Sequence, residues 1–425
     1  MRVLIVNTSE MRGGAAVAAN RLMDALNNNG VKAKMLVRDK DTDSITVAGI
    51  GGSTLQRWKF LWDRWRVFCH LNFSRKHLFD VDAGFCGTDI TRLREFKEAD
   101  LIHLHWINQG MLSMKDIRKI LDSGKPVVWT MHDIWPATAV CHVSLGCRKY
   151  LSECMKCPLL PEKSLFGDLA RHTWLKKERL LQNKNNICFV ACSKWLAGEA
   201  GRSALLAGQS ITAVPNPIDT RVYCPTDKDE ARRQMGLPLG KRLIAFVAQR
   251  VTNANKGIDY LIKACEMLAV KHQEMLGDTG IVILGSHAEY FSQKFKFPVY
   301  PIGYLSDEKK IINVYNSVDL FVTPSLSENL PNTIMEAMAC GVPCVGFDVG
   351  GIPEMIDHGK NGYVAQYRNA EDLAHGIYTV LTGGNLRRFG EEAVKKVAAS
   401  YSQQSVSLKY IEVYNQAVAY RHYRL

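Results

Sequence analysis

The chain has 425 residues, 47% of them hydrophobic and 23% charged, which is typical of a soluble globular protein with two or three domains. No apolar run is long enough to cross a bilayer, and the run at residues 3–6 is too short for a signal peptide, so we expect a cytosolic protein. A net charge of +12, from 54 basic and 42 acidic residues, favours anionic partners: nucleotides, nucleic acid or an acidic membrane face.

The first half of the chain alternates apolar strands with helical patterns. The run VLIV is continuous, as in a strand that is buried on both faces. A loop with Gly13 and Gly14 follows, and then apolar residues recur at helical spacing. Such alternation predicts a parallel sheet with helices on both sides. Strands are predicted at residues 3–6, 32–39, 101–106, 127–132, 187–193 and 211–217.

The same pattern restarts after a junction with prolines at positions 215, 217 and 225. We therefore expect an N-terminal domain over residues 1–214 and a C-terminal domain over 215–402. The tail, 403–425, is predicted to form a helix rich in aromatic residues. Further strands are predicted at 243–250, 281–285, 319–325 and 343–348, with a helix at 259–268.

The predicted fold class is α/β, with two doubly wound, Rossmann-like domains facing a central cleft. Ligands of such sheets bind beyond the carboxyl ends of the strands, so strand-end residues are the candidate site residues.

A helix start after the strand at 319–325 is the first candidate. Pro331 suits the beginning of a helix, and Gly341 suits its end. The free N–H groups and dipole of the first turn form an anion site. Glu328 in the loop and Glu336 in the helix are acceptors for sugar hydroxyls, and an anion between sugars describes a nucleotide-sugar.

Further charged or titratable residues lie at or after the ends of strands. Arg250 ends the first strand of the second domain and Lys256 follows six residues later, so together they could clamp a diphosphate. Two solvated surface cations are the alternative. His132, with Asp133, ends a strand of the first domain, and His103 and His105 end another.

The stretch SENLPNTIMEAMACGVPCVGFDVGGIPEMIDHGKNGYV, with QRVTNANKG and VPNPIDTRVYCP upstream, resembles the retaining GT-B glycosyltransferases of family 4. The likeness covers about residues 214–400 and is looser over the first domain, where GGAAVAANRLMDALNNNG and TMHD carry it. The resemblance implies transfer of a hexose from a UDP- or GDP-linked donor to a glycan or lipid-linked acceptor. Surface polysaccharide biosynthesis is the usual setting of such enzymes.

The resemblance also implies that the helix at 403–425 packs back on the first domain, and it implies roles for individual residues. Glu328 would hold the hexose, Glu336 the ribose, and His132 would contact the donor sugar. Arg250 and Lys256 would neutralise the leaving diphosphate, so no catalytic divalent metal is expected. The remaining implied contacts come from the backbone near Asn332 and Thr333 to the diphosphate, from Gly13 and Gly14 to phosphate and acceptor, and from the Gly303–Leu305 loop to the base.

Four cysteines crowd into a single short segment. Cys141, Cys147, Cys154 and Cys157 follow a C-x5-C-x6-C-x2-C pattern, which fits a structural zinc in a reducing compartment. His142 could replace one ligand, and four free thiols are the alternative.

Residues 57–76 contain six cations, one acid and three tryptophans. Trp58, Trp62, Trp65 and Cys69 recur at helical spacing, so the segment is either a helix on an anionic membrane surface or a core-facing helix with a basic outer face. Nucleic acid is disfavoured because no nucleic-acid module is present.

Three other classes remain to be weighed. A dinucleotide dehydrogenase is disfavoured because the first loop lacks G-x-G-x-x-G. A GT-B sugar-nucleotide epimerase and a non-catalytic nucleotide-sugar binding protein stay open as alternatives.

Overall fold

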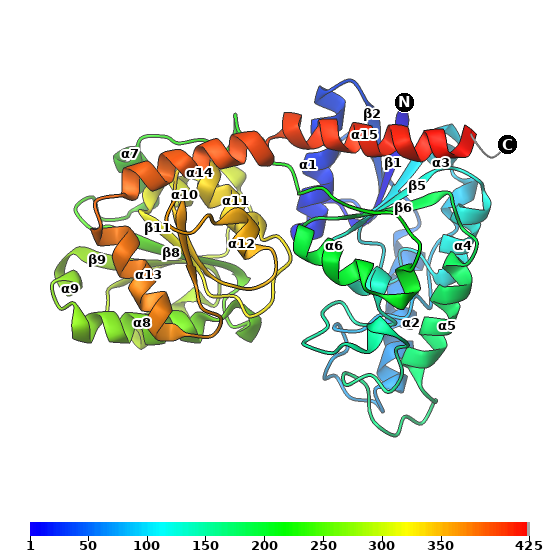
Figure 1. The fold of residues 1–425 in the computed structure, drawn as a ribbon, viewed down its shortest axis with the longest axis horizontal. Coiled ribbons are helices and arrows are strands. Elements are labelled where there is room, and N and C mark those ends of the chain that lie inside the picture. Colours follow the sequence, from blue (N-terminus) through cyan, green and yellow to red (C-terminus); the bar gives the residue numbers. More distant parts are fainter. Residues whose placement is uncertain (423–425) are drawn as a thin grey trace. The chain divides into compact units, whose positions relative to one another are not determined.

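The computed structural model describes residues 1–422 and divides the chain into two compact units. The first unit comprises Met1–Pro217 together with the chain from Val406 onward, and the second comprises Ile218–Ser405. The junction thus lies three residues after the boundary expected from the sequence. Both units are layered α/β structures, with helices on the two sides of a sheet (Figure 1).

The first unit contains a seven-stranded parallel sheet in the order β3-β2-β1-β4-β5-β6-β7. Its strands are β1 (Arg2–Ser9), β2 (Lys32–Asp39), β3 (Val47–Gly49), β4 (Leu101–Leu104), β5 (Val127–Met131), β6 (Ile187–Ala191) and β7 (Ile211–Ala213). Its helices are α1 (Gly14–Asn28), α2 (Ser53–His70), α3 (Arg94–Glu98), α4 (Met114–Asp122), α5 (Leu169–Leu181) and α6 (Lys194–Gly201).

The second unit contains a six-stranded parallel sheet in the order β10-β9-β8-β11-β12-β13. Its strands are β8 (Arg242–Arg250), β9 (Thr279–Ser286), β10 (Val299–Gly303), β11 (Leu320–Thr323), β12 (Cys344–Phe347) and β13 (Gly362–Ala365). Its helices are α7 (Lys228–Met235), α8 (Ile258–Lys271), α9 (Met275–Asp278), α10 (Glu308–Ser317), α11 (Asn332–Ala339), α12 (Ile352–Met355), α13 (Ala370–Thr382) and α14 (Leu386–Ser400).

The burial of strand β1 explains the unbroken apolar run at residues 3–6. Val3 and Ile5 point into a cluster with α1 and with the C-terminal helix, whereas Leu4 and Val6 point into the cluster on the opposite face. Both faces of the strand are therefore buried, as parallel sheets require.

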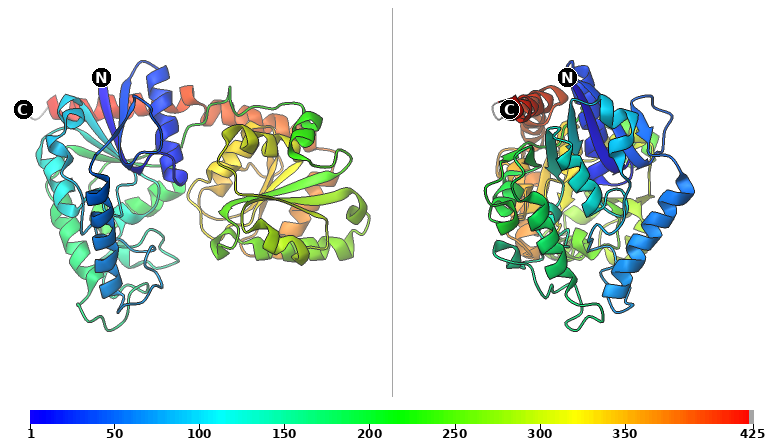
Figure 2. Two further views of the ribbon diagram at one scale, coloured as in Figure 1. Left: turned by 180° about the vertical axis from the view of Figure 1, so that it is seen from behind. Right: turned by 90° about the vertical axis from the view of Figure 1, so that its right-hand side faces the viewer.

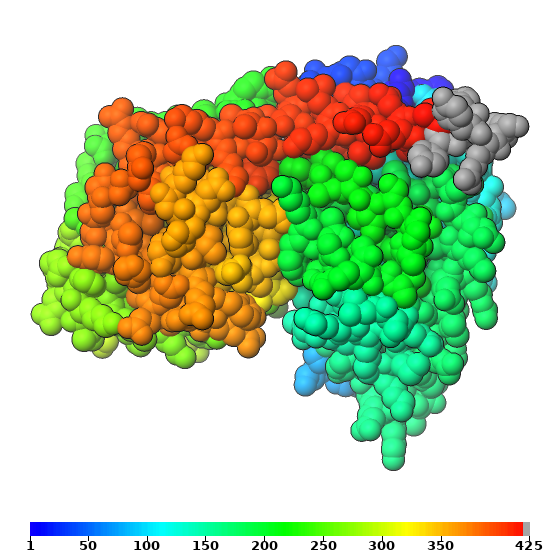
Figure 3. Space-filling view, viewed as in Figure 1, coloured from blue at the N-terminus to red at the C-terminus, as the bar shows by residue number. Residues whose placement is uncertain are grey.

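Helix α15 (Gln403–His422) ends the described chain, so the predicted helix is present up to residue 422 and its last three residues lie outside the described part. Val406, Tyr410 and Tyr414 are buried in the first unit's core. The red atoms of α15 form a band along that unit in Figure 3.

The sequence analysis missed three strands: β3, β10 and β13. The first and last have only three and four residues, and all three lie at or next to sheet edges, where fewer buried positions mark a strand. Helix α2 also differs from its prediction, because it begins at Ser53 and ends at His70, leaving residues 71–76 outside it.

Candidate active site

In the second unit, the candidate residues gather where the strand order reverses. The chain leaves β8 toward β9 and β10 on one side, and β11, β12 and β13 continue the sheet on the other. Crossovers that depart in opposite directions open a crevice at the carboxyl ends of the two central strands. Arg250 is the last residue of β8 and Glu328 lies in the loop after β11. The structure therefore places both at this switch point.

Lys256 and Glu328 are in direct contact. The Lys256 ammonium forms an ion pair with Oε1 of Glu328, with 33% and 14% of the two side chains exposed. The sequence placed these residues on separate loops and assigned them to diphosphate and hexose, without predicting the pair. Each charge is thus compensated by the other, and both side chains are exposed enough to exchange that partner for a ligand group.

The two loops that carry this pair are interlocked. The side-chain amide of Asn255 donates to the carbonyl of Ser327 at 2.9 Å, and the Leu326 N–H donates to the carbonyl of Asn255 at 2.8 Å. Gly257 has φ of +71°, and a Cβ there would lie 1.9 Å from the carbonyl oxygen of Pro324. Only glycine allows this approach, so the Lys256 and Glu328 backbones are held at a fixed separation.

A second glycine contact fixes Glu328 from the other side. Gly350, in the loop after β12, has φ of +60°, and a Cβ there would lie 1.7 Å from the Glu328 carbonyl oxygen. The next N–H, of Gly351, donates to the Asn329 carbonyl at 2.7 Å. The loop over residues 328–331 is therefore positioned by backbone contacts with residues distant in sequence.

Helix α11 begins at Asn332, with Pro331 at the N-cap and no side-chain cap. Asn332 and Thr333 are the first two residues of this helix, so their backbone N–H groups belong to its first turn. Glu336, one turn further on, is only 9% exposed, and its Oε2 accepts a hydrogen bond from the buried Tyr315 hydroxyl at 2.9 Å. One carboxylate oxygen of Glu336 is thus engaged inside the unit, a contact that the sequence did not predict.

Gly303 and Leu305 lie two strands away from the switch point, at the end of β10. Gly303 has φ of +73° and its strand pairing is irregular between Pro301 and Gly303. This loop and Arg250 therefore lie at the same edge of the sheet, and strand β9 separates β10 from β8.

In the first unit the strand order reverses between β1 and β4. The Thr8 hydroxyl lies 2.9 Å from the carbonyl oxygens of both Trp106 and Asn108 and, sharing its one hydrogen between them, ties the two strand ends together. Gly13, with φ of +92° and ψ of 162°, is the N-cap of α1, which begins at Gly14. The predicted glycine loop thus lies at this second switch point, in a conformation that favours glycine.

His132 follows β5 and belongs to a chain of buried polar groups. Its Nε2 lies 2.8 Å from Nδ1 of His105, and its Nδ1 lies 3.5 Å from the Cys192 sulfur. Since the Cys192 thiol donates to Asn216 Oδ1 at 3.2 Å, the sulfur accepts from His132 Nδ1, and His105 Nδ1 donates to His132 Nε2. Burial lowers the pKa of His132 to about 4, so the imidazole is neutral at pH 7.

Two tyrosines of α15 extend this chain. The Tyr414 hydroxyl lies 2.7 Å from Nδ1 of His103, and the Tyr410 hydroxyl lies 3.0 Å from that of Thr130, which contacts His103 Nε2 at 2.7 Å. The ring centroids of His103 and His105 lie 4.2 Å apart. The C-terminal helix therefore supports the histidines next to His132.

Asp133 and His142 form a buried ion pair. Oδ2 of Asp133 accepts from His142 Nδ1 at 2.8 Å and from the Trp106 indole at 3.0 Å. Burial alone would lower the pKa of His142, but the Asp133 carboxylate raises it above its usual value. His142 Nε2, His105 Nε2 and Asn108 Nδ2 are buried with no hydrogen-bond partner, and all three residues follow β4 or β5.

The four clustered cysteines line one cavity of about 450 Å³ as free thiols. Within residues 1–422, no three His, Cys, Asp or Glu side chains converge closely enough to hold a metal. His142, the alternative ligand, is paired with Asp133. The sulfurs would have to move toward a common point to bind zinc, so zinc remains a prediction.

Comparison with known proteins agrees with this architecture. Residues 227–397 match the family model "Glycosyl transferases group 1", and residues 12–222 match the model "Glycosyltransferase Family 4". The two matches fall on the two units in turn.

Solved structures with the same fold cover nearly the whole chain. Sucrose-phosphate synthase from Thermosynechococcus elongatus aligns over 98% of this chain and 99% of its own, with a TM-score of 0.68 and 18% identity. Anabaena HepE in complex with UDP-glucose aligns over 98% and 100%, with a TM-score of 0.62 and 16% identity. These likenesses define the class as GT-B.

An uncharacterized glycosyltransferase of Methanocaldococcus jannaschii is 30% identical over 195 residues, which are 45% of this chain and 49% of that protein. The chain spans about half the length of the curated relatives it matches. Taken with the family models and the fold, this places the chain in the GT-B glycosyltransferases of group 1. Among the described residues, no helix has the length and apolar character needed to span a membrane.

Proposed function

We propose that this protein is a retaining glycosyltransferase that moves a hexose from a nucleotide-sugar to a glycan or lipid-linked acceptor in surface polysaccharide assembly. The observation that carries the proposal is the Lys256–Glu328 ion pair at the switch point of the second sheet, beside the start of α11. A cation, a carboxylate and the N-terminal end of a helix together match the diphosphate and hydroxyls of a nucleotide-sugar. The UDP-glucose complex of HepE supports this ligand class.

The proposed donor site uses the second unit. Arg250 and Lys256 bind the diphosphate, and Lys256 stabilises the charge that develops on the leaving nucleotide. Once the diphosphate attracts Lys256, the Glu328 carboxylate is free to accept hexose hydroxyls. Glu336 binds the ribose, the N–H groups near Asn332 and Thr333 add to the diphosphate site, and the Gly303–Leu305 loop lies against the base.

The proposed acceptor side uses the first unit. Its strand ends carry the glycine loop at Gly13 and Gly14, which is proposed to approach the phosphate and the acceptor. His132 is proposed to contact the hexose as a neutral ring, since both of its nitrogens already face His105 and Cys192. The acceptor hydroxyl attacks the face of the hexose from which the nucleotide leaves, the leaving phosphate takes the acceptor proton, and no enzymic nucleophile is proposed.

The test is a panel of UDP-glucose, UDP-N-acetylglucosamine and GDP-mannose, with and without lipid-linked acceptor. We expect one donor to release free nucleotide faster when acceptor is present. Binding without release would identify a binding protein, and conversion to an isomeric nucleotide-sugar would identify an epimerase; either result would overturn the proposal.

A further inference from the structure

Helix α2 turns charged residues inward and tryptophans outward. Its inward residues include Asp63, 0% exposed, and Arg64, 5% exposed, whereas Trp58, Trp62 and Trp65 are 70%, 50% and 50% exposed. A helix on a protein surface normally shows the opposite arrangement. The core-facing alternative considered for the tryptophans is therefore wrong, and only Cys69 of the predicted stripe is buried.

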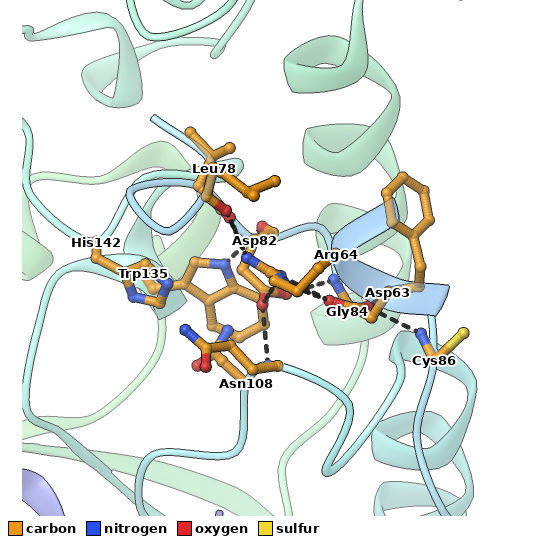
Figure 4. A network of polar contacts seen from close by, with 12 residues as sticks. Asp63, Arg64, Leu78, Asp82, Gly84, Cys86, Asn108, Trp135 and His142 are labelled. Carbon is orange, nitrogen blue, oxygen red and sulfur yellow. Dashed lines mark hydrogen bonds and ion pairs between the residues drawn. The ribbon is translucent and has the colours of Figure 1, made fainter. Parts of the chain in front are cut away.

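A buried ion network fixes this orientation (Figure 4). One Arg64 nitrogen, Nη2, donates to Asp63 at 2.6 Å and to Asp82 at 2.5 Å, and Nη1 donates to the carbonyls of Leu78 and Val81. Oδ1 of Asp63 accepts from the N–H groups of Phe85 and Cys86 at 3.1 and 3.2 Å. Rotating α2 to bury its tryptophans would expose these contacts and leave charges unpaired, so the outward stripe is enforced.

The apolar surface continues beyond the helix. Asn72 accepts from the Leu165 N–H at 3.1 Å and donates to the Lys163 carbonyl at 2.9 Å, joining the turn after α2 to a second loop. Phe73, Leu165 and Phe166 are 53%, 71% and 51% exposed. We call the surface of Leu55, Trp58, Leu61, Trp62, Trp65, Phe73, Leu165 and Phe166 the α2 patch. Figure 2 shows α2 on the outside of the first unit.

The charge around the α2 patch has one dominant sign. Segment 57–76 carries a single acid, Asp63, and that acid is internal. Arg57, Arg75, Lys76 and Lys163 are exposed, Lys59 and Arg66 are partly exposed, and Glu162, next to Lys163, is the exposed acid of the second loop. The outer face of α2 therefore presents cations and indoles without a compensating carboxylate.

From this combination we propose that the α2 patch docks on an anionic lipid bilayer. Indole rings prefer the headgroup level of a membrane, where one part of the ring is apolar and another can hydrogen-bond. Cations near an anionic leaflet each add about fivefold to partitioning. The proposal rests on exposure and charge in the first unit alone, and it does not depend on the proposed transferase reaction.

The first test measures partitioning of the full chain on vesicles of phosphatidylcholine with and without phosphatidylglycerol. We expect binding only to the anionic vesicles, and weakening when salt is raised from about 0.1 M to about 0.5 M. Brominated lipids should quench fluorescence of the bound protein. Trp58→Ala/Trp62→Ala/Trp65→Ala should bind at least tenfold more weakly and lose the quenching, with an unchanged thermal melt.

A matched control and a second variant keep the test decisive. Val270→Ala/Tyr290→Ala removes side chains that are 75% and 65% exposed in the second unit and should bind like wild type. Arg57→Gln/Arg75→Gln/Lys76→Gln, which leaves the indoles in place, should bind between about tenfold and hundredfold more weakly. Its control is Lys309→Gln/Lys310→Gln/Arg388→Gln, which removes three exposed cations of the second unit.

Four results would overturn the proposal. The first two are equal binding to neutral vesicles and wild-type binding by both α2 variants. The third is unfolding of the tryptophan variant combined with wild-type binding by the charge variant. The fourth is displacement of the protein from vesicles by a short RNA that binds more tightly.

Discussion

Replacing Gly350 with alanine tests whether Glu328 must be held where the structure places it. The new Cβ would lie 1.7 Å from the Glu328 carbonyl oxygen, whereas real Cβ contacts stay beyond 3.0 Å, so one backbone must move by more than 1 Å. A displacement of about 1 Å at a positioned group can cost about 100-fold in rate. We therefore expect kcat/KM for the active donor to fall about 100-fold, while affinity for the free nucleotide changes little.

The matched control is Gly359→Ala. Gly359 has φ of +74°, close to the +60° of Gly350, but nothing lies within 4 Å of its added Cβ. Both variants bear a left-handed strain of about 1–2 kcal/mol in stability, and only Gly350→Ala moves Glu328. The assays are thermal melts, nucleotide titration and donor turnover. Equal turnover in the two variants would refute the argument that Gly350 positions the site.

Three further predictions concern other parts of the chain. Lys256→Ala should lower kcat by about 10²–10³-fold, because the leaving nucleotide loses its cation, and Glu328→Gln should weaken the nucleotide-sugar without weakening the nucleotide; wild-type kinetics in both would remove the donor assignment. Elemental analysis of chelator-free protein should find about one zinc per chain, and metal-free protein that is fully folded would contradict the four-cysteine site. Burial lowers the pKa values of His103 and His132 to about 3 and about 4, and it lowers the pKa of His105 well below its usual value. The unfolded chain therefore takes up protons below about pH 6.5 that the native state does not, so the thermal melting temperature should fall as the pH is lowered from about 6.5 to about 4. Burial raises the pKa of Asp63 to about 6, so its carboxyl binds one proton in the native state that the unfolded chain lacks, which opposes the effect of the histidines. A melting temperature that rises as the pH is lowered would contradict this explanation.

The sequence located the candidate donor residues because strand-end residues are marked locally. Arg250, Lys256 and Glu328 follow apolar runs, and the start of α11 carries its own proline signal. The sequence does not mark which strands are neighbours in the sheet. Strand β8 pairs with β11, although β9 and β10 lie between them along the chain. The Lys256–Glu328 ion pair depends on that order and could not be predicted.

Contacts between segments that are distant in the chain could not be predicted from the sequence for the same reason. Tyr414 and His103 are 311 residues apart, so a helical aromatic tail does not predict a tyrosine bonded to a strand histidine. In α2, periodicity identified an amphipathic helix but not which face turns inward. That choice depends on Asp82, which lies 18 residues from Arg64 and outside the helix.

The central claim is transfer of a hexose out of a nucleotide-sugar, and a proton NMR time course of an α-linked donor with acceptor tests it most directly. The account predicts one free nucleoside diphosphate for each hexose lost, a new α-anomeric signal on the acceptor, and no change in samples of Lys256→Ala over the same period. A β-anomeric product would contradict retention, and an isomerised or unconsumed donor would contradict transfer itself.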